Sequence, residues 1–233
     1  MEEHTFAICA YGESPYLEEC IKSVKNQSVK SKVILSTSTP CDYIQRLCKK
    51  YSIPYFINYG ESGITQDWNF AYSKAETPIV TIAHQDDIYF RKYSEYVIKS
   101  YKGAKVPLIF FSDYYELRNE KIVKNTLLLN IKRLMLFPLR ATFLQSNIFV
   151  RRRILALGSP ICCPSVAFFK HHLPPPFLII IFVQTKIGKR GNEFPKSKDN
   201  FYTAKSHSWH TEFIKLQKHQ WQFNKMGVGQ TKI

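Results

Sequence analysis

The sequence lacks any apolar run long enough to cross a lipid bilayer as a helix. Such a helix needs about 20 consecutive apolar residues, whereas the longest candidate, residues 173–183, has roughly half that length and includes three prolines. The first four residues, MEEH, are acidic and lead straight into a strand-like segment, which is not the pattern of a secretory signal. We therefore expect a cytoplasmic protein.

Cysteine pairs at metal-binding or redox spacing are also missing. The six cysteines form no CxxC pair and have no histidines at the spacing of a zinc site. In a cytoplasmic protein such cysteines are ordinarily free thiols in the core. We expect this state for all six, which are Cys9, Cys20, Cys41, Cys48, Cys162 and Cys163.

Acidic residues are scarce, since 18 Asp and Glu stand against 33 Lys and Arg and leave a net charge of +15. The excess is uneven: residues 178–233 contain 10 basic and 3 acidic residues. No basic stretch alternates with aromatic residues as in a nucleic-acid stacking surface, so a nucleic-acid-binding protein is the alternative here and not the expectation. A basic surface also suits an enzyme that handles diphosphates, or one associated peripherally with the inner face of a membrane.

Short apolar runs alternate with amphipathic segments through the first half of the chain. Near-continuous apolar strands separated by helices predict an α/β fold with a mostly parallel central sheet flanked by helices. Ligands of such sheets bind beyond the carboxyl ends of the strands. Residues 114–158 then indicate a hairpin followed by helices. The expected strands are 5–11, 33–36, 55–58, 79–83 and 108–112, and the expected helices are 16–26, 41–51, 65–74, 93–101, 127–136 and 152–157.

Two adjacent carboxylates follow the fourth of these strands. The apolar run 79–83 leads directly into His84, Gln85, Asp86 and Asp87. Neighbouring carboxylates at the end of a buried strand repel each other, and a bound divalent cation relieves that cost. Hard oxygen ligands suit Mg²⁺ or Mn²⁺, and such a cation can hold a diphosphate. The alternative interpretation of the pair is a turn with solvated acids.

The order of the motifs around this pair resembles family 2 glycosyltransferases. Residues 6–13 (FAICAYGE) and the helix after them are similar to the family's first strand and helix. Later motifs continue the resemblance over about residues 5–177. They are NYGESG at 58–63, DWNFA at 67–71, the strand and acidic motif at 79–87, and GSPICCPSV at 158–166, which is similar to an acceptor-side loop of one bacterial subgroup.

This resemblance implies the nucleotide-diphospho-sugar transferase fold, called GT-A, and an inverting sugar transfer. A nucleotide-diphosphate sugar would be the donor, and a glycan or a lipid-linked molecule the acceptor. The resemblance places Ala10, Tyr11 and Glu13 at the base and ribose, Asp86 near the ribose and the metal, and Asp87 on the metal, Mn²⁺ or Mg²⁺. Residues 1–177 would form the transferase domain, with a donor-binding half at 5–113 and an acceptor-side part at 114–177.

One position departs from the family pattern. Where the family usually has an acidic pair that reads the base, after the second strand, this chain has Ser36-Thr37-Ser38-Thr39-Pro40. Hydroxyl groups can also bond a base, so Ser36 is included among the expected donor-binding residues. A capping turn before the next helix is the alternative for Ser36 and Thr37. Asp113, at the end of its own strand, has two interpretations as well, an acceptor-facing acid or a turn acid.

The character of the chain changes after Phe177. Residues 178–233 lack the acidic-aromatic motif that would carry the family's catalytic base, so the base is expected to be lost after Phe177 and no catalytic residue is assigned. We interpret this segment as an aberrant tail and not as part of the transferase domain.

A shifted reading frame would account for the tail. New codons can be formed from the last base of each codon and the first two of the next. The degeneracy of residues 184–193 then permits N-E-D-W-E-A-W-E-R, and that of residues 208–214 permits M-A-H-R-I-H. Both strings are similar to the missing family motifs and lie in one frame. We therefore hypothesise a single-base frameshift near Phe177 and Leu178, in the gene or in its sequencing.

Three functions are open at this point. The first is a glycosyltransferase, inactive if residues 178–233 stand as written, because a general base contributes about 10²–10⁴-fold in rate. The second is a remnant that binds nucleotides without catalysis. The third is the basic nucleic-acid-binding protein.

Overall fold

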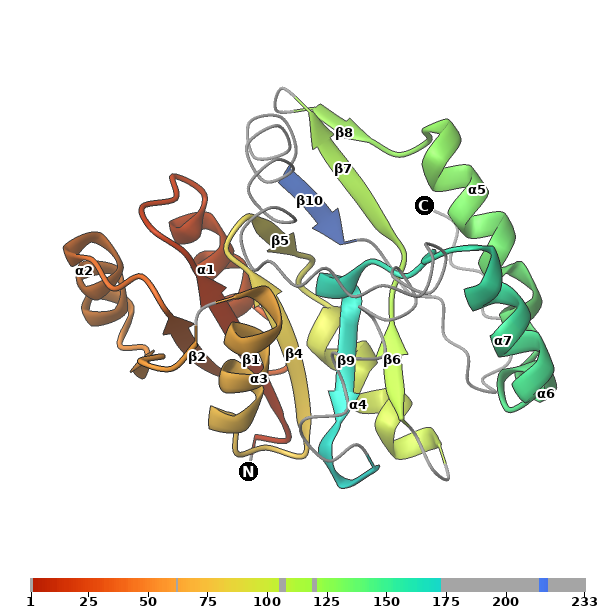
Figure 1. Cartoon of the computed structure of the whole chain (residues 1–233), viewed down its shortest axis with the longest axis horizontal. Helices are drawn as coiled ribbons and strands as arrows, with labels where there is room; N and C mark the ends of the chain where they lie inside the picture. The colour runs from red at the N-terminus through yellow and green to blue at the C-terminus, as the bar shows by residue number, and fades with distance from the viewer. Residues whose placement is uncertain (1, 62, 105–107, 119–120, 173–213, 218–233) are drawn as a thin grey trace.

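The computed structural model describes residues 2–61, 63–104, 108–118, 121–172 and 214–217 (Figure 1). Its central sheet has six strands in the order β3-β2-β1-β4-β9-β6. β1 pairs in parallel with β2 and β4, and β2 with β3, whereas β9 runs antiparallel to both of its neighbours. The strands are β1 (His4–Ala10), β2 (Lys32–Thr37), β3 (Tyr55–Ile57), β4 (Ile79–His84), β6 (Ile109–Phe111) and β9 (Val166–Phe169).

Helices cover both faces of this sheet because successive strand side chains point to opposite sides. Phe6 and Ile8 of β1 pack into a core with the helices on one face, whereas Ala7 packs into the core on the other. The first face holds α1 (Leu17–Lys25), α2 (Asp42–Tyr51) and α4 (Tyr93–Gly103), and the second holds α3 (Ile64–Lys74) (Figure 1). The carboxyl ends of β1, β2, β3 and β4 consequently lie along one edge of the sheet.

A smaller four-stranded sheet continues from β4. Its order is β5-β10-β7-β8, and β5 (Asp87–Tyr89) begins directly after the two-residue turn that follows β4. The hairpin expected at residue 114 is present as β7 (Tyr114–Arg118) and β8 (Lys121–Val123), and β10 (Ile214–Gln217) pairs with β5 and β7. After the hairpin come α5 (Leu127–Leu136), η1 (Phe137–Arg140), α6 (Thr142–Gln145) and α7 (Ile148–Leu157), and the short turns η2 (Cys163–Ser165) and η3 (Lys170–His172) flank β9.

The expected fold class, an α/β fold with a mostly parallel sheet flanked by helices, is confirmed. The sequence pattern missed β9 and β5, and it began the last helix at residue 152, whereas α7 starts four residues earlier at Ile148. The six cysteines are free thiols, as expected, but only three of them lie in the core. Cys20, Cys48 and Cys162 are buried, whereas Cys9, Cys41 and Cys163 are partly exposed. Among the residues that the structure describes, no helix is long and apolar enough to span a membrane.

The expected loss of the general base after Phe177 falls on a part of the chain that the structure does not describe. Phe177 itself lies outside the described residues, and so do residues 178–213 and 218–233. From the segment that we interpret as an aberrant tail, the structure describes only β10. The frameshift near Phe177 and the position of a general base therefore stay predictions from the sequence.

A buried histidine joins the central strands. His4 is fully buried, with Nδ1 2.8 Å from Ser31 Oγ and Nε2 2.9 Å from Thr81 Oγ1. Burial penalises the charged imidazolium and lowers the pKa of His4 to about 3. The ring is therefore neutral in the folded protein at neutral pH.

This burial predicts a loss of stability in mild acid. Between an unfolded pKa of about 6.5 and the folded pKa of about 3, the unfolded chain binds a proton that the folded chain does not, so stability falls as the pH falls. At about pH 5 the loss through His4 alone is roughly 2 kcal/mol. In His4→Gln this part of the pH dependence should disappear. Urea unfolding at several pH values measures it, and parallel curves for the two proteins would contradict the prediction.

Candidate functional site

The acidic motif lies at the carboxyl end of β4, on the ligand-binding edge of the sheet. His84 is the last residue of β4, Asp86 lies in the turn that follows, and Asp87 opens β5. One ligand atom from each of these three side chains lies within 4.8 Å of the other two. Asp87 is only 2% exposed, and its Oδ2 is 3.7 Å from His84 Nδ1. The structure therefore gathers two carboxylates and an imidazole at one point.

The His84 ring is held in place by its surroundings. It stacks on the Trp68 indole of α3, with ring centroids 5.0 Å apart and an interplanar angle of 26°. From the other side, the Cys20 thiol of α1 donates to the His84 carbonyl oxygen at 3.2 Å. Contacts from α3 and α1, which cover opposite faces of the sheet, thus fix the backbone and the ring of this one residue.

The two carboxylates create a negative electrostatic potential that acts on the groups around them. The pKa values of the Cys20 thiol and the Tyr89 hydroxyl lie well above their usual range, first because both groups are buried and second because Asp87 is close to each. Asp86 raises the pKa of Cys20 further. These two buried groups thus stay uncharged beside the motif.

This donor set fits a divalent metal ion. Carboxylate oxygens are ligands for both Mg²⁺ and Mn²⁺, whereas an imidazole nitrogen is a common ligand of transition metals and a rare one of Mg²⁺. His84, Asp86 and Asp87 together offer one nitrogen and two carboxylate ligands to such an ion.

The loop after β1 is tied to the acidic motif through Gln85. The backbone N–H of Tyr11 donates to Gln85 Oε1 at 2.9 Å, and Gln85 Nε2 donates to the Tyr11 carbonyl at 3.2 Å. The next residue, Gly12, has φ of +58°, and its N–H donates to Thr39 Oγ1 at 2.7 Å. Thr39 thus fixes the first loop. Of the expected capping turn, the Thr39 N–H does donate to Thr37 Oγ1 at 3.0 Å, but no side chain caps the start of α2.

The predicted donor-binding residues of β1 occupy different environments along this loop. Ala10 is 5% exposed and ends the strand, whereas the Tyr11 side chain is 68% exposed and Glu13 is also exposed. Because Gln85 holds the Tyr11 backbone, an exposed aromatic ring and a carboxylate are presented next to the Asp86 turn. The structure therefore brings the first-strand loop and the acidic motif together.

Ser36 is placed differently from what its predicted role requires. It is 2% exposed within β2, and its hydroxyl is directed at Cys9 Sγ, 4.0 Å away. The polar groups at this edge come instead from Asp67 of α3, whose carboxylate accepts hydrogen bonds from Ser38 Oγ at 3.0 Å and Asn58 Nδ2 at 2.9 Å. An acid therefore does stand beside the end of β2, but it comes from α3.

Several of these contacts were not predicted from the sequence. Gln85 lies within the recognised motif. Unlike the acids beside it, its amide has both a donor and an acceptor, and this is the feature of the sequence that could have indicated a backbone bridge. Asp67 also lies in a recognised motif, but its partners are 9 and 29 residues away in the sequence. Asp113 forms an ion pair with Arg133, with Oδ2 and Nε 3.0 Å apart, and both interpretations of this acid stay predictions.

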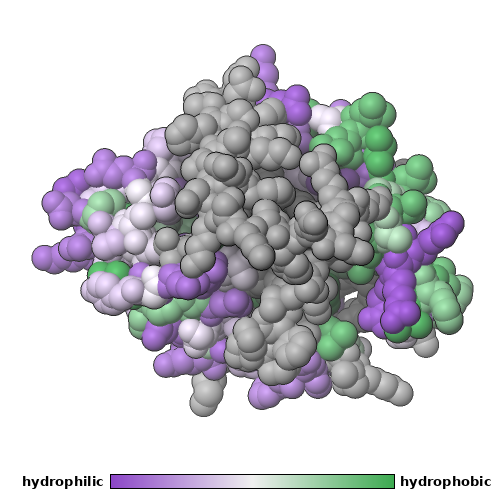
Figure 2. Space-filling model, viewed as in Figure 1, coloured by the Kyte–Doolittle hydropathy of each residue, from purple (hydrophilic) through white to green (hydrophobic). Residues whose placement is uncertain are grey.

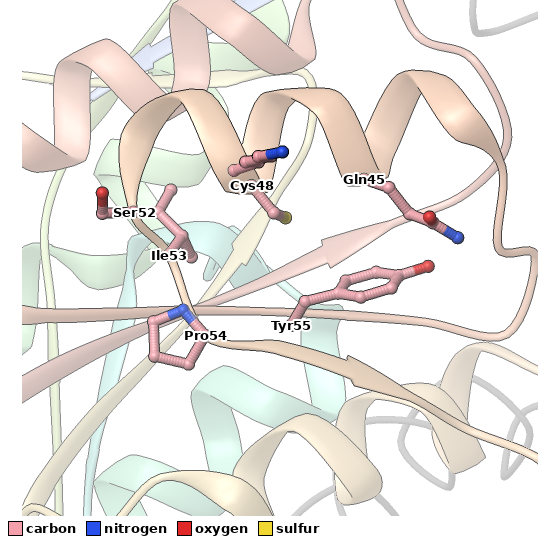
Figure 3. A pocket seen from close by; sticks show the side chains of 7 residues that line it. Gln45, Cys48, Ser52, Ile53, Pro54 and Tyr55 are labelled. Carbon is pink, nitrogen blue, oxygen red and sulfur yellow. The ribbon is translucent and has the colours of Figure 1, made fainter.

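Two pockets lie away from this site. The larger, about 610 Å³, is bordered by α2 and the edge strand β3, three strands along the sheet from β4 (Figure 3). It has no carboxylate among its lining residues, which are Gln45, Cys48, Lys49, Ser52, Ile53, Pro54 and Tyr55. The smaller, about 10 Å³, lies under α5 beside Asp113 and Arg133. Neither contains the acidic motif.

Known proteins share this fold. The model of the family described as glycosyl transferase family 2 matches residues 5–173. Glucosyl-3-phosphoglycerate synthase from Mycobacterium tuberculosis, solved with Mn²⁺ and UDP-glucose, is similar in structure with a TM-score of 0.51 and 12% identity, over 73% of this chain and 57% of that one. The mannosyltransferase PcManGT from Pyrobaculum calidifontis, solved with GDP-Man and Mn²⁺, has a TM-score of 0.48 and 16% identity, over 72% and 45%.

These identities show a common fold and no more, and the chain spans about half the length of the two solved proteins. No curated protein sequence matches the chain. The family model, however, covers most of the sequence and includes every residue of the site described above. The chain belongs to glycosyl transferase family 2.

Proposed function

We propose that this site transfers a sugar from a nucleotide-diphosphate donor to a glycan or lipid-linked acceptor, with inversion at the anomeric carbon. The observation that carries the proposal is the cluster of His84, Asp86 and Asp87 at the carboxyl end of β4. Gln85, in the middle of the cluster, also holds the loop after β1. A metal site and a loop with exposed donor-binding candidates are therefore parts of one unit.

In this proposal Asp86 and Asp87 hold Mn²⁺, and His84 is either a third ligand or a positioning residue for Asp87. When bound, the metal ion would offset the charge that develops on the departing nucleoside diphosphate. Asp86 is more exposed than Asp87 and would contact both the ribose and the metal, whereas the buried Asp87 would bind the metal alone. Mg²⁺ would serve less well because of the imidazole.

The nucleoside would lie across the ends of β1 and β2. The exposed Tyr11 ring offers an apolar surface for a base, and Glu13 offers an acceptor for ribose hydroxyls. We assign the hydrogen bonds to the base to Ser38 and Asp67 and leave Ser36 as a buried support, because only the first two lie at the edge. Residues 5–113 then form the donor-binding half, and residues 114–177 the acceptor side.

The general base is the missing part of this enzyme. The family match stops at residue 173, just before Phe177, where we place the frameshift. We propose that the chain as written binds donor but transfers sugar poorly, and that the shifted frame restores the base. Donor binding without turnover is the remnant function, and the same experiments distinguish it. A nucleic-acid-binding function has no support in the geometry of the site.

The metal-binding pair predicts a defined loss in two variants. Asp86→Asn and Asp87→Asn each remove one negative charge, so the Mn²⁺-dependent affinity for UDP or GDP should fall by about tenfold or more. Isothermal titration with and without Mn²⁺ measures it. Glu19→Gln makes the same chemical change at an exposed position of α1 and should bind as the parent does. Equal effects of Mn²⁺ on all four proteins would refute the metal site.

The Gln85 bridge predicts a change in nucleotide affinity without a change in metal affinity. Gln85→Leu removes two hydrogen bonds to the Tyr11 backbone, each contributing about 0.5–1.5 kcal/mol, so nucleotide binding should weaken by about fivefold or more. Binding of Mn²⁺ alone, followed by its paramagnetic effect on water relaxation, should stay the same. Gln45→Leu, at an exposed position of α2, is the control. Unchanged nucleotide affinity in Gln85→Leu would show that the loop stands without this bridge.

The frameshift hypothesis predicts a gain of activity. We expect a gain of rate in the protein encoded by a gene whose frame is shifted by one base after the codon of Phe177. Because this protein regains a general base, it should release nucleoside diphosphate from UDP-glucose or GDP-mannose at least about 10²-fold faster than the chain as written. A coupled assay for the released diphosphate measures this rate. Equal rates from both proteins, or a sequenced locus in which the present frame continues into residues 178–233 of an active enzyme, would end the hypothesis.

A further inference from the structure

The solvent-facing side of α5 is apolar, the reverse of the usual arrangement in a surface helix. Leu127, Ile131 and Leu134 follow one another at intervals of four and three residues and are 79%, 46% and 73% exposed. Leu128, on the same side, is 52% exposed. The helix is well defined, since the Thr126 side chain accepts a hydrogen bond from the Leu129 N–H at its start. The exposed stripe is therefore a property of a formed helix.

Lys132 and Arg133 of α5 contact the body of the protein, next to the buried Leu129, whereas Asn130 is exposed. Lys132 Nζ donates to the Tyr114 hydroxyl at 2.8 Å, and Arg133 pairs with Asp113 at 3.0 Å. Arg133 also donates to the Lys124 carbonyl at 2.8 Å. These contacts fix the rotation of the helix, because turning the leucines inward would break all of them. The apolar face consequently remains exposed.

The following helices extend the same surface. α5 packs against η1 and α7, and α6 packs against the same two elements. They add exposed side chains that are large and apolar, and Figure 2 shows green surface gathered over this part of the molecule, next to a purple strip. We call this surface the α5–α7 face, and its apolar members are Leu127, Leu128, Ile131, Leu134, Phe137, Phe143, Ile148, Phe149 and Leu157.

The charge around this face has a single sign. Residues 121–158 contain eight Lys and Arg and no Asp or Glu. Arg140, Arg151, Arg152 and Arg153 are exposed. Arg152 and Arg153 lie four residues after Ile148 and Phe149. Each of these two exposed apolar side chains therefore has an arginine one helical turn away. Apolar groups flanked by guanidinium groups on one side match an acyl-chain boundary beneath anionic headgroups.

We propose that the α5–α7 face docks on the surface of an anionic lipid bilayer. A second copy of the chain is a poorer occupant, because a self-complementary interface would place arginines against arginines. A nucleic acid would match the arginines but leave exposed leucines and phenylalanines without an apolar partner. This docking does not depend on the acidic motif. It would hold the site beside the membrane, where a lipid-linked acceptor is found.

Flotation of the full chain with vesicles tests the proposal. The chain should bind vesicles of phosphatidylcholine mixed with phosphatidylglycerol, and bind phosphatidylcholine alone at least about tenfold more weakly. Leu127→Gln combined with Leu134→Gln should weaken binding to the mixed vesicles by about tenfold, because two apolar side chains that would insert at the acyl-chain boundary are replaced by polar ones. Arg152→Gln with Arg153→Gln should weaken it by a similar factor and reduce its dependence on salt.

Matched controls separate this role from misfolding and from general charge. Val29→Gln with Leu108→Gln removes two exposed apolar groups elsewhere, and Lys30→Gln with Lys49→Gln removes two exposed charges, and both should bind vesicles as the parent does. Mn²⁺-dependent nucleotide binding should be unchanged in every variant. Three results would overturn the proposal: no binding to mixed vesicles, a dimer in light scattering that the leucine variants dissociate, or oligonucleotide binding that only the arginine variants lose.

Discussion

The central constraint on this molecule is the concentration of negative charge at the end of β4. A carboxylate that is 2% exposed, with a second one next to it in sequence, is costly in a protein interior unless a positive charge is nearby. Burial and the nearby Asp87 raise the pKa values of Cys20 and Tyr89 well above their usual range, so these two neighbours remain neutral. His84 offers one positive charge when protonated, and a divalent cation offers two. The donor loop, the helices around His84 and the start of the second sheet are all arranged about this point.

Most of the sheet could be predicted because its strands are buried on both faces. Such strands appear as continuous apolar runs, and the four parallel strands β1 to β4 agree with the expected ranges within one or two residues at each end. β9 was missed because its four residues, VAFF, follow a proline-containing loop and acquire their role only by insertion between β4 and β6. β5 was missed because it is three residues long and begins with the very aspartate that was interpreted as a loop ligand.

The site was predictable to the extent that its residues are neighbours in sequence. The acid pair and the first loop were identified for that reason, whereas their connection through Gln85 spans 74 residues and depends on the register of β1 against β4. The position of Ser36 depends in a related way on the length of β2. A strand-end position was expected, but β2 extends to Thr37 and the Ser36 side chain is buried, while its donor-binding role stays a prediction. The carboxylate at that edge belongs to Asp67, which no local pattern links to β2.

On the acceptor side, the sequence pattern predicted a helix correctly but not which of its sides is exposed. Residues 127–136 were correctly predicted as a helix, but periodicity alone assigns the apolar side to the core. Leu129 follows this assignment and is 1% exposed, whereas Leu127, Ile131 and Leu134 lie on an exposed outer face. Lys132 and Arg133 hold the helix in this rotation through their contacts with Tyr114 and Asp113. The chain has a net charge of +15, and part of its excess of basic residues surrounds this outer face. The same excess favours an anionic diphosphate at the metal site, so both proposed ligands are negatively charged.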